Sequence, residues 1–126
     1  MRPQGWVARK GKVNMLDLQT IIDELIAFRD ERDWLQFHNP KDLAVAISIE
    51  AAELLEVFRW SGEDMSAEGR EKKVKEELAD VLIYCLYLAD VIGVNPLEAI
   101  EDKINVNSGK YPAEKSRGNA RKYTEL

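Results

Sequence analysis

The spacing of apolar residues limits this chain to helices. From Leu16 to Asn107 they recur every three or four positions, as on one face of a helix, and no segment alternates as a strand does. Asn39 and Asn95 each precede a proline, which is typical of a capped helix start. The predicted helices cover residues 16–34, 40–60, 66–92 and 96–107, with Ser66 capping the third and Gly93 ending it. The pattern predicts an all-α fold, a four-helix bundle.

Length and charge narrow the class of protein. With 126 residues, the chain is expected to form one domain, residues 15–126, preceded by a flexible basic arm, residues 1–14. The net charge of −5 argues against a nucleic-acid binder, and the longest apolar run, Val81–Ala89, is too short to span a membrane. No signal-peptide pattern is visible, so we expect a cytoplasmic protein. The single cysteine, Cys85, lies within that run and is predicted to be buried.

Two acids interrupt the apolar stripe of the second predicted helix. Glu50 lies three residues after Ile47 and four before Leu54, in the middle of that stripe. Glu53 lies one turn further along on the same side, about 4.5 Å along the axis. An isolated pair of acids with this spacing often lies half-exposed at the edge of a helix face, so the pair alone is weak evidence for a metal site.

The third predicted helix repeats the anomaly. Glu77 lies three residues after Val74 and four before Val81, again within the apolar stripe, and Asp80 follows at the same three-residue spacing. Two such pairs on neighbouring helices form a much stronger signal than one. The sequence therefore predicts four carboxylates that converge in a central acidic site.

Clustered buried carboxylates are costly unless their negative charge is relieved by protonation, by buried cations or by a bound metal. Lys103 is the clearest basic residue within the helical stripes, and one cation does not neutralise four acids. An all-oxygen ligand set suits Mg2+ or Mn2+ rather than zinc. A di-iron bundle is disfavoured, because it needs two Glu-x-x-His motifs and the only histidine, His38, lies outside both helices.

A hard-metal site in a small bundle points to phosphate chemistry, where the ions offset phosphoryl charge and activate water. Lys103 and Asn107 share a face of the fourth predicted helix, and the tail that follows is basic. Trp34, Trp60 and Tyr84 supply aromatic rings of the kind that bind a base, although each alone is more often a packing residue.

Several motifs resemble one family. IEAAELLEVFRW followed by EELADVLIY resembles the ExxE…ExxD signature of the all-α nucleoside triphosphate pyrophosphohydrolases, the MazG-like superfamily. ERDWLQFHNPKDL, the VFRW ending and KYP…ARKYTEL are similar to its dCTP pyrophosphatase branch. Many MazG-like proteins begin the first motif with two glutamates. This chain has Ile49 there, as that branch does.

The resemblance implies Mg2+-dependent hydrolysis, with Mn2+ as a possible substitute, of a nucleoside triphosphate to the monophosphate and pyrophosphate. It also implies a homodimer or homotetramer, whose pocket can include residues of a second chain. Glu50 or Glu53 would accept the proton of water, and the sequence leaves that choice open. The implied metal ligands are Glu50, Glu53, Glu77 and Asp80; the base-binding residues are Trp34, His38, Trp60 and Tyr84; the phosphate-binding residues are Lys103, Asn107, Lys110, Tyr111, Arg121 and Lys122.

Other functions remain open on the sequence alone. The branch resemblance favours dCTP or a modified dCTP, and hence a nucleotide-pool sanitising role. The same fold also suits dUTP, another non-standard nucleotide or phosphoribosyl-ATP, since only the base pocket separates these substrates. A non-catalytic helical interaction module is the third reading, and the presence of all four acids counts against it.

Overall fold

The computed structural model describes residues 17–126, so the predicted arm, residues 1–14, lies outside the described residues. Within 17–126 the chain forms only helices and turns, which confirms the all-α prediction. The helices are α2 (Leu18–Glu31), α3 (Pro40–Glu56), α4 (Glu71–Ile92), α5 (Pro96–Lys110) and α6 (Ala113–Ser116), with the 3-10 turns η2 (Leu35–Phe37) and η3 (Tyr123–Glu125).

The helix ends follow capping rules where the sequence carries clear caps. The Asn39 side chain accepts from the backbone N–H of Asp42, and Asn95 accepts from those of Leu97 and Glu98. Gly93 ends α4 with φ 72°, a left-handed conformation that costs glycine little.

Four other predicted helix ends are wrong, the simplest case being α5, which continues three residues past Asn107 to Lys110. The first helix ends at Glu31, because Asp33 turns left-handed with φ 54°, so Trp34 lies beyond the helix. α3 ends at Glu56, and Trp60 lies beyond it with φ 70°. Ser66 caps no helix: it bonds to Asp64 in the connecting loop, and α4 begins five residues later, at residue 71.

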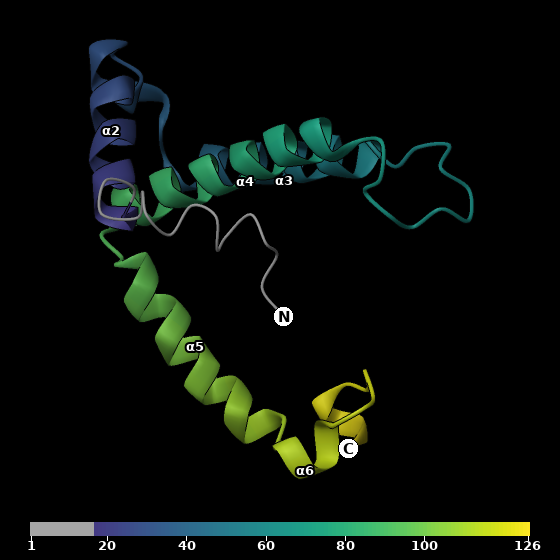
Figure 1. The fold of residues 1–126 in the computed structure, drawn as a ribbon. Coiled ribbons are helices and arrows are strands. Elements are labelled where there is room, and N and C mark those ends of the chain that lie inside the picture. Colours follow the sequence, from purple (N-terminus) through teal and green to yellow (C-terminus); the bar gives the residue numbers. More distant parts are fainter. Residues whose placement is uncertain (1–16) are drawn as a thin grey trace.

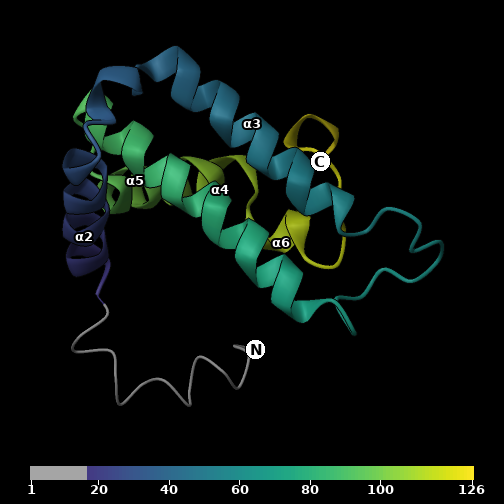
Figure 2. The ribbon, with the colours of Figure 1, turned by 90° about the horizontal axis from the view of Figure 1, so that it is seen from above.

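α3 and α4 form the centre of the fold. They run side by side and are joined by the loop of residues 57–70, while α2 crosses the end where α3 begins (Figures 1 and 2). Leu43 of α3 and Tyr87 and Ala89 of α4 are the buried apolar residues of the described chain. The Tyr87 hydroxyl donates to the Leu25 carbonyl over 2.8 Å, which ties α4 to α2.

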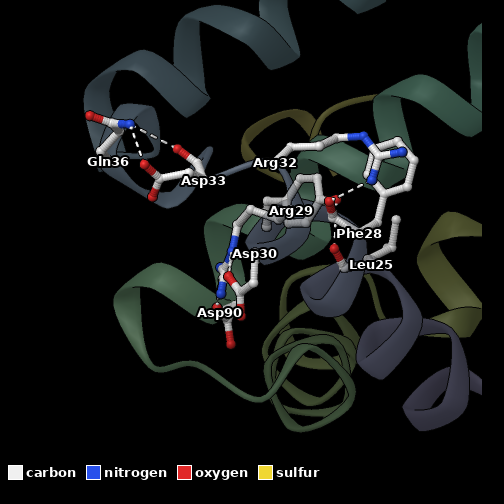
Figure 3. Close-up of polar contacts among 9 residues, drawn as sticks. Leu25, Phe28, Arg29, Asp30, Arg32, Asp33, Gln36 and Asp90 are labelled. Carbon is white, nitrogen blue, oxygen red and sulfur yellow. Dashed lines mark hydrogen bonds and ion pairs between the residues drawn. The ribbon is translucent and has the colours of Figure 1, made fainter.

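A buried arginine provides a second tie between α2 and α4. Arg29 is 4 % exposed, and its guanidinium donates to Asp30 over 2.9 Å and to Asp90 over 2.7 Å (Figure 3). Sequence reasoning missed Arg29. Arg29 and Asp90 are 61 positions apart in the sequence, and local spacing does not reveal such a pair.

α5 extends away from the other long helices and packs along none of α2, α3 and α4 (Figure 1). Its apolar face, Leu97, Ile100 and Ile104, is more than half exposed. The segment after α5 folds back on its end, where the rings of Tyr111 and Tyr123 lie 5.9 Å apart.

Cys85 is exposed, contrary to the prediction that it is buried. It shares a face of α4 with Leu78 and Leu82, which are exposed as well, so an apolar run does not mark a helix that is buried all round. Among residues 17–126, none of the helices combines the length and apolarity needed to cross a membrane.

Candidate metal centre and aromatic pocket

The side-by-side packing of α3 and α4 brings acids of both helices together. Glu50, Glu53 and Glu77 each offer a carboxylate oxygen, and these oxygens all lie within 4.8 Å of one another. Asp80 is not part of that trio, but it lines the same cavity as Glu50. The four predicted acids thus lie near one another between α3 and α4, and the carboxylates of three of them form a cluster.

The acids differ in burial. Glu77 is 6 % exposed and Glu50 is half-buried, whereas Glu53 is exposed. Glu53 was expected to face the interior. It lies one turn before the end of α3 and lines an open cavity.

Two of the three ways to relieve clustered negative charge are visible. A hydrogen bond with Glu53, burial and the charges of Glu53, Asp80 and Glu77 raise the pKa of Glu50 to about 7. Lys73, one turn before Glu77, donates to its Oε1 over 2.9 Å. Lys103, the expected buried cation, is exposed on α5 instead.

Unsatisfied oxygens distinguish this cluster from an ordinary acidic surface. Glu50 Oε2 and Glu77 Oε2 are both buried without a hydrogen-bond partner. An unpaired buried acceptor is costly, and carboxylate oxygens are the ligands that hard divalent cations prefer. These residues therefore fit a divalent cation.

An aromatic cavity of about 310 Å³ adjoins the acids. Trp34, His38 and Tyr84 line it together with Glu50 and Asp80, so three of the four predicted base-binding residues meet beside two of the acids. The walls come from α2, the residues that flank η2, α3 and α4.

Sequence reasoning missed Phe28 and Tyr87 in this cavity. The ring centroids of Phe28 and Trp34 lie 5.8 Å apart, and those of His38 and Tyr87 lie 4.8 Å apart. The Arg32 guanidinium lies 3.5 Å from the Phe28 ring centroid and donates to the Phe28 carbonyl (Figure 3). Tyr87 follows Tyr84 by three positions, so helical spacing places both rings on one face of α4.

His38 presents a neutral imidazole to the cavity. Burial, and then the positive charge of Arg29, lower the pKa of His38. Its Nδ1 is buried without a hydrogen-bond partner. A neutral imidazole has one donor and one acceptor nitrogen, so His38 is able to hydrogen-bond to the polar edge of a ligand.

Trp60 is not in this cavity. It is 87 % exposed and follows the end of α3, whereas His38 precedes the start of that helix. The 17 residues of α3 span roughly 25 Å at 1.5 Å per residue. The two predicted base-binding residues therefore lie at opposite ends of α3.

The predicted phosphate-binding residues also lie apart from the acids within one chain. Lys103, Asn107 and Lys110 are exposed on α5, which extends away from α3 and α4 (Figure 1). Tyr111 follows α5, and Arg121 and Lys122 lie in the segment folded against its end. Lys110 Nζ lies 4.8 Å from the ring centroid of Tyr123.

Paired carboxylates on two packed helices beside an aromatic pocket define an all-α protein with a candidate hard-metal site. The chain belongs to the MazG-like family, whose model matches residues 45–126.

The similarity extends to curated relatives. The dCTP pyrophosphatase 1 of Homo sapiens is 42 % identical over 104 residues, which cover 79 % of this chain and 61 % of the relative. The dCTP pyrophosphatase 1 of Mus musculus is 40 % identical over 104 residues, with the same coverage. The chain thus spans about 61 % of the length of these relatives.

A solved structure supports the fold. The crystal structure of a pyrophosphatase from Archaeoglobus fulgidus DSM 4304 matches with a TM-score of 0.71 and 50 % sequence identity. The match covers 75 % of this chain and 92 % of that protein.

Proposed function

We propose that this protein hydrolyses a nucleoside triphosphate to the nucleoside monophosphate and pyrophosphate. One observation carries the proposal: a single cavity joins the rings of Trp34, His38 and Tyr84 to the carboxylates of Glu50 and Asp80. The rings suit a base, and the acids suit the cations that accompany a triphosphate. Family membership and the similarity to dCTP pyrophosphatase 1 favour the same reaction.

The four acids would hold the cofactor, Mg2+ with Mn2+ as a substitute. A divalent cation bound there makes water more acidic and offsets negative charge on phosphoryl oxygens. Glu50 or Glu53 takes the proton of the attacking water, and both remain candidates because both carboxylates belong to the same cluster.

Stacking between aromatic rings holds the base but tolerates any base. Discrimination therefore falls to polar groups at the base edge, and the neutral imidazole of His38 is the best placed. We propose dCTP or a modified dCTP as the substrate, on the similarity to dCTP pyrophosphatase 1. A cytoplasmic location remains the prediction made from the sequence.

A second copy of the chain would complete the site. The exposed apolar face of α5 favours burial against another chain. Trp60 lies away from the acids of its own chain, and so do the basic groups of α5 and the tail. In a homodimer or homotetramer these residues would contribute to the nucleotide site of a partner chain.

Release of pyrophosphate from the four dNTPs, with and without Mg2+, tests the proposal. We expect Mg2+-dependent turnover, highest with dCTP. Glu77→Gln should lower kcat by roughly 100-fold or more, because replacing even the outer partners of metal ligands costs 10- to 100-fold. Glu24→Gln, on exposed α2 surface, is the matched control. Turnover by Glu77→Gln at the parent rate would refute the ligand assignment.

A further inference from the structure

The acid cluster adjoins a second cavity besides the aromatic one. Glu50 and Asp80 line the aromatic cavity, whereas Glu53 and Glu77 line another of about 320 Å³ together with Glu56, Val57 and Lys73. Because oxygens of Glu50, Glu53 and Glu77 lie within 4.8 Å of one another, both cavities open onto the same cluster.

Among residues 17–126, Lys73 is the only lysine or arginine that lines either of these cavities. Its Nζ lies 2.9 Å from Glu77 Oε1, but its side chain is 60 % exposed while that of Glu77 is 8 % exposed. The ammonium group thus occupies the rim of the cavity and reaches inward to the buried acid.

The ion pair between Lys73 and Glu77 is weak enough for Lys73 to leave Glu77 when another cation binds there. A lysine four residues before a glutamate is the less favourable order on a helix, and such pairs contribute little to stability. A divalent cation on Glu77 would repel the nearby ammonium, because the two positive charges would share one carboxylate. The released lysine would remain at the rim, beside Glu53 and Glu56.

A phosphate group is a suitable new partner for the Lys73 ammonium once the ion pair with Glu77 is broken. Within the described part of the chain, the other residues that line the cavity are Glu53, Glu56, Glu77 and the apolar Val57, so an anion there needs both the bound cation and a basic side chain. Lysine serves phosphates as a compact point charge with three donors.

We infer that the cavity beside Lys73 receives the β- and γ-phosphates, which leave as pyrophosphate, and that Lys73 moves from Glu77 to these phosphates when the metal binds. This inference rests on the proposed function. It orders the substrate along α3 and α4, with the base in the aromatic cavity and the terminal phosphates toward the start of α4. Lys73 is then a phosphate contact supplied by the chain that carries the acids.

Calorimetric titration of the full-length protein with inorganic pyrophosphate and with dCMP, both in Mn2+, tests the assignment. Lys73→Met should weaken pyrophosphate binding by roughly 10- to 100-fold, the equivalent of one charge-assisted hydrogen bond. It should leave dCMP binding unchanged, since dCMP lacks the terminal phosphates. Lys73→Arg should retain most of the pyrophosphate affinity.

Lys75→Met is the matched control, because Lys75 is exposed on the same helix two positions further on and lines neither cavity. Titration with Mn2+ alone should show that Lys73→Met binds the metal at least as tightly as the parent, since Glu77 loses a competing cation. Parent-like pyrophosphate affinity in Lys73→Met would overturn the inference. An equal loss of pyrophosphate, dCMP and Mn2+ affinity would also overturn it, because Lys73 would then only support Glu77.

The parent's turnover of the four dNTPs separates this inference from the proposed function. A parent that hydrolyses dNTPs, with a Lys73→Met variant of unchanged pyrophosphate affinity, refutes the role of Lys73 alone. A parent that hydrolyses none, while Lys73→Met still loses pyrophosphate affinity selectively, refutes the proposed reaction and supports the phosphate cavity.

Discussion

Glu50 holds its proton more tightly than a glutamate in water. Its hydrogen bond with Glu53, its burial and three neighbouring acids all disfavour the charged form, and the pKa rises from 4.5 to about 7. Near neutral pH a large fraction of the metal-free native molecules therefore carries this proton. A metal that binds Glu50 has to displace this proton, which couples metal affinity to pH.

The contribution of Glu50 to the stability of the metal-free protein should fall as pH rises between 4.5 and about 7, whereas the lowered pKa of His38 acts in the opposite direction below 6.5. In this window the native state holds a proton on Glu50 that the unfolded chain has released, so the contribution of Glu50 to the free energy of unfolding falls with rising pH. Urea unfolding in EDTA at about pH 5 and about pH 8 measures the change. Glu50→Gln should flatten this contribution, and identical pH profiles for parent and variant would contradict the raised pKa.

The position of α2 depends on contacts with α4 near the aromatic cavity. Arg29 of α2 is buried and pairs with Asp90 of α4, and Tyr87 of α4 bonds to the Leu25 carbonyl of α2. Phe28 of α2 lines the aromatic cavity. These ties hold one wall of the cavity in place, so breaking them should affect both stability and base binding.

Asp90→Asn should destabilise the fold. Breaking a buried ion pair costs roughly 3–5 kcal/mol, because the remaining charge is left unpaired. Asp90 is 35 % exposed and Arg29 keeps Asp30, so we expect about 2–3 kcal/mol by urea unfolding. Asp102→Asn, on the exposed surface of α5, should change the free energy of unfolding little. An Asp90→Asn variant as stable as the parent would show that Asp30 alone satisfies Arg29.

In the whole chain, acids from two helices meet while apolar faces of α5 and α4 remain exposed. Leu97, Ile100 and Ile104 form one such face, and Leu78 and Leu82 belong to another. Under the proposed function, a bound cation and a second copy of the chain would each add stability to the native state.

Saturating Mg2+ or Mn2+ should raise the melting temperature of the parent. A ligand at 100 times its Kd stabilises the native state by about 2.7 kcal/mol, which corresponds to a rise of roughly 10 °C. A variant with all four acids changed to their amides should lose this response and gain stability without metal. Melting curves recorded with the metal and with EDTA measure both effects. A parent indifferent to the metal would contradict the site.

Charges on the apolar face of α5 should dissociate the proposed oligomer. Ile100→Glu combined with Ile104→Glu places two carboxylates where the face would be buried against a second chain. Light scattering coupled to gel filtration should give a dimer or tetramer for the parent and a smaller species for the variant. Glu101→Gln, on the same helix, is the control. A parent that elutes as a monomer would refute the assembly.

Which residues share a helix face, and where capped helices begin, could be predicted from the amino-acid sequence alone. The three-residue spacing of Glu50 with Glu53 and of Glu77 with Asp80 placed each pair on one side of its helix. Asn39 and Asn95 marked helix starts that the structure confirms. These features depend only on local geometry and local hydrogen bonds, so periodicity and capping chemistry are sufficient to predict them.

Which helix faces meet could not be predicted in this way and depends on how the helices pack together. Three features follow from how α2, α3 and α4 cross and where they end. Arg29 pairs with Asp90, Phe28 lines the aromatic cavity, and Trp60 lies far from that cavity. The left-handed turn at Asp33 redirects the chain after α2. Spacing along one helix carries no information about its crossing angle or its neighbours, because these depend on packing between segments far apart in the chain.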